Sequence, residues 1–268
     1  MQYTDSGGTD SEALVLLHAG VFADWFIPLD HQPALADMRR IRVTRTGYAN
    51  DPPVTPLTVE DHARECADLL RALDVNRAHL VAHSAGAVFA LQMALDYPDL
   101  VSDFVLIEPP LIEPLTPAED HAPLGAVLGP VMGIALTAAM RGDLVAAFDT
   151  FMAAVCGPDY PAAITAALGP DGLAKARADC GYFFTGEIPA IGQWHFDNQL
   201  ALRINQPVHL VGGNDSPLFT RNMLSYLATI LPNADSTILA GQNHLLPLRA
   251  SADLANLITA ITATEPAF

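Results

Sequence analysis

Short apolar runs alternate with segments of helical length in the first half of the chain, and this alternation restricts the possible folds more than any other feature. The runs at 13–17, 41–44, 79–82 and 104–107 predict buried strands. The segment at 59–73 repeats apolar or small residues at the spacing of one helix face. Strands separated by helices pair in parallel, so we predict an α/β fold with a mostly parallel central sheet flanked by helices.

The alternation stops in the middle of the chain. From about Pro109 to about Arg203 no clean strand pattern is present, and Ala, Pro and Gly are frequent. Towards the C-terminus the alternation resumes, with strands expected at 208–211 and 236–239 and helices at 217–231 and 250–261. We therefore predict a core formed by residues 1–108 and 206–268, interrupted by a helical cap at 109–205.

A stretch within the predicted cap is nearly as long as a membrane span. Residues 122–140 contain no charged residue. The stretch is interrupted by Pro123, Pro130 and several glycines, and much of the remainder is Ala, so its apolarity is modest. We expect a broken apolar helical segment of a soluble protein and no membrane span.

Charge limits the possible partners. With 13 Lys and Arg against 30 Asp and Glu, the chain carries a net charge of −17 at pH 7. Nucleic acids and anionic membrane surfaces are bound through Lys and Arg, so neither is an expected partner. One basic cluster stands out, and we expect its side chains to flank a strand and extend into solvent: Arg39, Arg40, Arg42 and Arg45.

The cysteines give no sign of a metal site. Cys66, Cys156 and Cys180 lie far apart, and none belongs to a C-x-x-C motif. An odd number of separated cysteines favours a reduced, cytoplasmic protein, and the first eight residues are polar, unlike a signal peptide. We expect no metal and a cytoplasmic location.

Ser84 lies where a strand changes into a helix. A serine on such a sharp turn exposes its hydroxyl beyond the sheet, and small residues are needed two positions before and after it. Those positions hold Ala82 and Gly86. The N–H of Ala85 would begin the helix and face developing negative charge, so we predict Ser84 as a nucleophile, with a helix N-cap as the alternative role.

A serine nucleophile needs a base, and the base needs a carboxylate. His244 follows the last predicted strand, where the active sites of open α/β sheets lie, and is the expected base. Asp215 follows the strand at 208–211 and is the favoured acid. Glu108, directly after the strand at 104–107, is the alternative.

Further side chains are expected around this centre. Gly20 follows the first predicted strand and offers a second backbone N–H to an oxyanion. Trp25 is expected to pack beneath that loop or to line the substrate pocket. Met132, Phe184 and Trp194 belong to the apolar part of the cap, and they are expected to line the pocket or to pack the cap onto the sheet.

These motifs resemble those of the α/β-hydrolase superfamily, in its capped bacterial esterase, lactonase and carbon–carbon hydrolase branch. The matching pieces are Leu16-Leu17-His18-Ala19-Gly20 with Trp25, Gly47-Tyr48, Ala82-His83-Ser84-Ala85-Gly86, Gly213-Asn214-Asp215 and Asn243-His244. The order Ser84, Asp215, His244 is also the family's order. Ala19 and Ala82 depart from the family's usual glycines but remain small. The resemblance implies a cap after the sixth strand and no cofactor.

The resemblance implies a serine hydrolase that acts on a small apolar ester or lactone through an acyl-enzyme. Carbon–carbon bond hydrolysis and a cofactor-free haloperoxidase-like reaction remain alternatives on the same residues, and a non-catalytic receptor for a small ligand is an alternative of a different class. A carboxylate nucleophile, as in epoxide hydrolases and haloalkane dehalogenases, is excluded by Ser84. A homodimer is one assembly compatible with this pattern.

Overall fold

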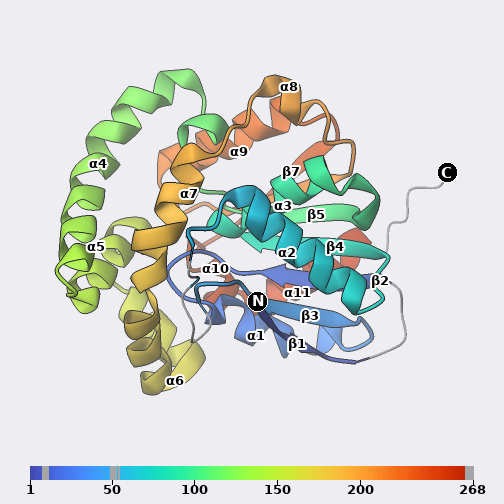
Figure 1. Cartoon of the computed structure of the whole chain (residues 1–268), viewed down its shortest axis with the longest axis horizontal. Helices are drawn as coiled ribbons and strands as arrows, with labels where there is room; N and C mark the ends of the chain where they lie inside the picture. Colours follow the sequence, from blue (N-terminus) through green and yellow to red (C-terminus); the bar gives the residue numbers. More distant parts are fainter. Residues whose placement is uncertain (8–11, 49–52, 54, 263–268) are drawn as a thin grey trace.

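The computed structural model describes residues 1–7, 12–48, 53 and 55–262 and contains a seven-stranded sheet in the order β1-β3-β2-β4-β5-β6-β7 (Figure 1). The strands are β1 (Gln2–Asp5), β2 (Glu12–Leu17), β3 (Arg40–Thr44), β4 (Arg77–His83), β5 (Val101–Ile107), β6 (Val208–Gly213) and β7 (Ala234–Leu239). All neighbouring strands pair in parallel except β1 with β3. The predicted mostly parallel α/β sheet is confirmed. Strand β1 was not predicted, because its short polar sequence has no apolar run.

Helices cover both faces of the sheet. One face packs against α2 (Val59–Ala72), α3 (Ala85–Asp96) and α9 (Leu218–Ile230), and the other against α1 (Ile27–Asp30), α10 (Leu246–Arg249) and α11 (Ser251–Thr262). Helix α2 begins with a reciprocal capping box between Thr58 and Asp61. Strands covered on both sides need apolar residues on both faces, and the inner residues of β2, β4 and β5 are fully buried.

Only helices occur between β5 and β6 in the described chain. They are η4 (Glu113–Leu115), α4 (Ala118–Met140), α5 (Leu144–Cys156), α6 (Tyr160–Asp179), the short π-helix η5 (Phe183–Glu187), α7 (Ile188–Gln193) and α8 (Asn198–Ala201). Helices α4, α5 and α6 gather on one side of the molecule (Figure 1). They share a hydrophobic cluster with the loop after β2, in which Phe148 lies 6.1 Å from Phe22 between ring centres. This helical segment therefore packs over the carboxyl end of β2.

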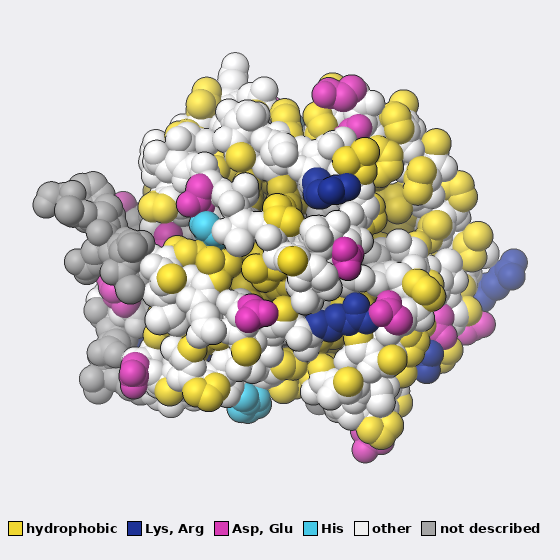
Figure 2. Space-filling model, turned by 180° about the vertical axis from the view of Figure 1, so that it is seen from behind, with side chains coloured by type: hydrophobic (Ala, Val, Ile, Leu, Met, Phe, Trp, Pro, Cys, Tyr) yellow, Lys and Arg dark blue, Asp and Glu magenta, His cyan; other side chains and the backbone are white. Residues whose placement is uncertain are grey.

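Helix α4 is continuous, which corrects the expectation of a broken segment. Pro123 and Pro130 lie inside it without ending it. By length and composition it is the one helix of the described residues that could cross a membrane, with a mean hydropathy of 1.7 over its most apolar window and 17% of that window buried. Val127, Ile134 and Met140 are exposed. Seen from behind, hydrophobic side chains are visible on the side of the molecule where α4 lies (Figure 2).

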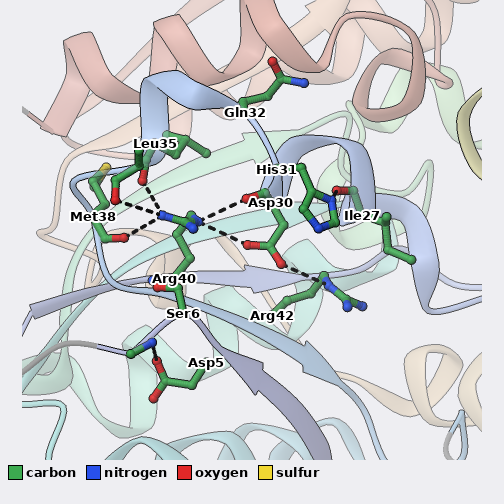
Figure 3. Close-up of polar contacts among 12 residues, drawn as sticks. Asp5, Ser6, Ile27, Asp30, His31, Gln32, Leu35, Met38, Arg40 and Arg42 are labelled. Atoms are coloured by element: carbon green, nitrogen blue, oxygen red, sulfur yellow. Dashed lines mark hydrogen bonds and ion pairs between the residues drawn. The ribbon is translucent and has the colours of Figure 1, made fainter.

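The chain between β2 and β3 forms three short pieces, η1 (Asp24–Phe26), α1 and η2 (Pro33–Leu35). Pro33 begins η2 and cannot continue α1, because it lacks an N–H. The side chain of Arg40 replaces the lost helical hydrogen bonds. Its guanidinium donates to the carbonyl oxygens of Leu35 and Met38 and to the carboxylate of Asp30 (Figure 3).

The arginine cluster does not extend into solvent as expected. Arg39 pairs with Asp5 at 2.8 Å, and Arg42 pairs with Asp30 at 3.5 Å. Arg45 is fully buried and pairs with Glu187. Acidic residues of neighbouring segments pair with these guanidiniums, which is why they lie inside the fold instead of in water.

Candidate active site

Ser84 occupies a strained turn between β4 and α3. Its φ of 51° and ψ of −122° are uncommon for a residue with a side chain. Its N–H donates to the carbonyl oxygen of Ile107 on the neighbouring strand at 2.9 Å. A Cβ at Gly86 would lie 2.4 Å from the carbonyl oxygen of Leu17, so helix α3 can approach β2 this closely only because glycine stands there. The turn therefore has the geometry that exposes a nucleophilic hydroxyl.

His244 lies in the loop after β7 and is held by Glu108. Its Nδ1 is 2.9 Å from Glu108 Oε2. The Glu108 carboxylate is 1% exposed, and its other oxygen accepts from the N–H of Gly213 and the hydroxyl of Ser216. A buried carboxylate that is fixed by hydrogen bonds can hold the imidazole in one orientation.

Among the described residues, the carboxylate paired with His244 belongs to Glu108, the alternative acid, and no hydrogen bond or ion pair joins His244 to the favoured Asp215. Asp215 is exposed, and it bonds through its backbone N–H to the carbonyl oxygen of Gln242 at 2.9 Å. Strand register explains the outcome. Ile107 pairs with Val211, so Glu108 directly follows its strand beside β6, whereas the chain after β6 has already turned outwards at Asp215.

The loops after β6 and β7 are in backbone contact beside this pair. A Cβ at Gly213 would lie 2.0 Å from the carbonyl oxygen of Gln242, closer than any side chain permits. The side chain of Asn214 also accepts from the N–H of Gly241 at 2.7 Å. These contacts fix the path of the loop that carries His244.

The N–H groups of Gly20 and Ala85 are both available. Within the described residues neither has a hydrogen-bond partner. Ala85 stands at the first position of α3, where helical N–H groups have no partner within the helix. The carbonyl oxygen of Gly20 accepts from Trp25 Nε1 at 3.0 Å. Gly20 lines the same cavity as Ser84, and Ala85 directly follows Ser84, so both N–H groups belong to residues beside this serine.

The cavity beside Ser84 and His244 is small and partly open to solvent. Its remaining lining is apolar or backbone and comes from the loop after β2 and from the helical segment: Ala19, Gly20, Val21, Trp25, Phe151, Met152, Val155, Cys156 and Phe183. Neither Lys nor Arg lines it. The cavity therefore suits a small, uncharged group.

Three of the four expected pocket residues do not line this cavity. Trp25 does, but Trp194 packs in the main core and donates through Nε1 to Gln92. Phe184 packs behind Phe183, with ring centres 5.0 Å apart, and Met132 lies on α4. Helix α5 supplies the lining instead, through Phe151, Met152 and Val155. The apolar composition of α5 was visible in the sequence, but its orientation towards Ser84 was not.

Three other titratable groups, His18, His83 and Cys156, lie at this cavity or next to residues that line it. Burial lowers the pKa of His18 well below its usual range, and the charge of Arg45 adds to the effect. Burial also lowers the pKa of His83 well below its usual range, with a further contribution from His244. Burial raises the pKa of Cys156, so this thiol lines the cavity in its neutral form. Among the described residues, no group of three or more His, Cys, Asp or Glu could hold a metal ion.

Solved structures with the same fold include enzymes of several activities. The enol-lactonase of Burkholderia xenovorans LB400 superposes with a TM-score of 0.74 at 18% identity, over 98% of this chain and 96% of that one. Est816, described as an N-acyl homoserine lactone degrading enzyme, gives a TM-score of 0.68 at 21% identity, over 97% and 95%. At these identities the similarity shows the fold alone.

Curated relatives match over shorter segments. The 2-hydroxy-6-oxononadienedioate/2-hydroxy-6-oxononatrienedioate hydrolase of Burkholderia vietnamiensis is 36% identical over 114 residues, 40% of this chain and 39% of that protein. RutD of Pantoea ananatis, named as a carbamate hydrolase, is 47% identical over 49 residues, 18% of each chain. The matched segments thus span less than half the length of these relatives.

The match to a family model covers far more of the chain than these relatives do. The model of the alpha/beta hydrolase family matches residues 14–257 of the 268. This span includes Ser84, Glu108 and His244. The chain therefore belongs to the alpha/beta hydrolase family.

Proposed function

We propose that this protein is a serine hydrolase that cleaves small, neutral esters or lactones through an acyl-enzyme. One observation carries the proposal: Ser84 and His244 line the same cavity, while the buried Glu108 holds the far side of the His244 ring. No hydrogen bond joins Ser84 Oγ to His244 in the described structure. Such contacts are often loose in the free enzyme and tighten when substrate binds.

The arrangement supports general-base catalysis by His244, in the following steps. His244 Nδ1 donates to Glu108, so Nε2 is the nitrogen that can accept the proton of Ser84. Ser84 Oγ attacks the carbonyl carbon, and the N–H groups of Gly20 and Ala85 stabilise the oxyanion. His244 then gives its proton to the leaving alcohol. Water, activated by the same ring, releases the acid and restores Ser84.

The lining of the cavity favours a neutral substrate. The Burkholderia vietnamiensis relative is named for a dioate substrate, whereas no Lys or Arg lines this cavity to pair with a carboxylate. Burial of an unpaired charge is unfavourable, so a charged acyl group should bind poorly. An ester or lactone is therefore preferred over a carbon–carbon bond in a diacid, although the same residues could carry out both reactions.

Labelling and turnover together test the proposal. The wild type should hydrolyse p-nitrophenyl acetate and react with a fluorophosphonate probe. Ser84→Ala should abolish labelling and lower kcat by several orders of magnitude. Ser236→Ala, which changes an exposed serine on β7, is the matched control and should behave as wild type. Equal labelling of wild type and Ser84→Ala would refute the proposal, and ligand binding without turnover would indicate a receptor.

A further inference from the structure

A fully buried ion pair joins the helical segment to the loop that carries Gly20. Arg45, at the end of β3, and Glu187, at the end of η5, have side chains that are 1% and 0% exposed, and Arg45 Nη1 lies 2.5 Å from Glu187 Oε2. The cost of removing two charges from water commonly matches or exceeds their attraction, so stability alone does not explain such a pair. Its other contacts suggest a role.

Arg45 binds the backbone immediately before Gly20. Its Nη2 donates to the carbonyl oxygens of His18, at 3.2 Å, and Ala19, at 3.1 Å. The C=O of Ala19 and the N–H of Gly20 belong to one planar trans peptide and point in opposite directions. A guanidinium that holds the Ala19 oxygen therefore also sets the direction of the Gly20 N–H.

The peptide after Gly20 is held as well. The N–H of Val21 donates to the hydroxyl of Tyr48 at 3.1 Å, and the carbonyl oxygen of Gly20 accepts from Trp25 Nε1. Val21 has a φ of 74°, which is strained for a β-branched residue. The surroundings must enforce such a conformation, so the orientation of this loop depends on the contacts around it.

Glu187 provides the link to the helical segment. A Cβ at Gly20 would lie 2.8 Å from Glu187 Oε1 and 2.4 Å from the Phe183 ring, so η5 rests directly on the loop. Glu187 is also the charge partner of Arg45. The guanidinium is buried and lies 4.3 Å from the ring centre of Phe89, so its charge needs a counter-ion.

We propose that Arg45 and Glu187 are positioning residues, which direct the Gly20 N–H towards the oxyanion and make that direction depend on the docking of η5. This inference rests on the proposed function. Removal of one oxyanion donor commonly lowers kcat by about 10²–10³. Misdirection of one donor should therefore lower kcat by about tenfold or more and leave KM nearly unchanged.

Two variants separate positioning from folding. Arg45→Met combined with Glu187→Leu replaces the pair by apolar side chains, which buried pairs often tolerate without loss of stability. It should fold and lose kcat about tenfold or more. Glu187→Gln keeps an oxygen that can accept from Arg45 and should lose only a fewfold. Asp149→Asn, which weakens an Arg177 ion pair between α5 and α6, is the control and should leave kcat unchanged.

The measurements are kcat and KM for p-nitrophenyl acetate, thermal unfolding, and the rate ratio of an ester to its thiono analogue, in which sulfur replaces the oxygen that enters the oxyanion site. A merely structural role would change the melting temperature without changing that ratio. If the wild type is inactive, the proposed function fails. If the wild type is active and the folded double variant keeps its kcat and its ratio, the positioning role is refuted.

Discussion

Exchange of the Glu108 carboxylate for an amide tests the site most directly. In Glu108→Gln the amide oxygen can still accept from Gly213 and Ser216. The amide NH₂ would then face His244 Nδ1, which must become an acceptor, so the proton moves to Nε2. In that tautomer the ring cannot accept the proton of Ser84. The analogous exchange in a Ser-His-Asp enzyme lowers kcat by about 10⁴, equivalent to about 5 kcal/mol in the activation free energy.

Asp215→Asn is the matched control for this exchange. Asp215 is exposed, and its recorded hydrogen bond uses the backbone, so the variant should keep kcat within about twofold and stability within about 0.5 kcal/mol. Glu108→Gln should lower the free energy of unfolding by about 1–3 kcal/mol, since a charge-assisted hydrogen bond is lost. Both variants are measured by p-nitrophenyl acetate kinetics and urea unfolding. A hundredfold loss of kcat in Asp215→Asn with near-normal Glu108→Gln would refute the assignment.

Three further predictions concern a loop, pH and substrate length. Gly213→Ala should lower kcat at least tenfold and destabilise the fold, because its Cβ would collide with backbone that leads to His244; unchanged kinetics would contradict the close contact. Burial lowers the pKa of His62 to about 3 in the folded state, and the charge of Arg45 adds to the effect. Between about pH 6.5 and pH 3, His62 therefore gains a proton in the unfolded state but not in the folded state. The free energy of unfolding should therefore fall by about 1.4 kcal/mol per pH unit from this group between pH 6 and 4, and His62→Gln should reduce the slope measured by urea unfolding; an identical slope in both proteins would exclude this contribution. The kcat/KM for p-nitrophenyl esters should rise by up to about fourfold per methylene from acetate to butyrate. Val155→Phe, which narrows the cavity, should remove that gain, and a flat wild-type profile would exclude an apolar acyl site.

The sequence by itself determined the features that depend on local chemistry. Strands covered on both faces must be continuous apolar runs, which is why β2, β4 and β5 were predicted. The turn at Ser84 needs small neighbours because a helix begins beside a strand, so the presence of Gly86 supported the prediction of this turn. The capping box of Thr58 and Asp61 is likewise a contact across three residues.

The tertiary structure decided every contact between residues far apart in the chain. Asp215 and Glu108 both follow strands of the sheet, and only the register of β5 against β6 and the outward path of the chain after β6 place Glu108 beside His244. The buried position of the Arg45 side chain could not be predicted from the sequence either. Four arginines of similar local sequence were expected in solvent, yet one lies buried against Glu187, 142 residues away. The hydrophobic pattern of the sequence indicates which face of a helix or strand is apolar. The partner of a buried charge, however, depends on which distant segment packs against it.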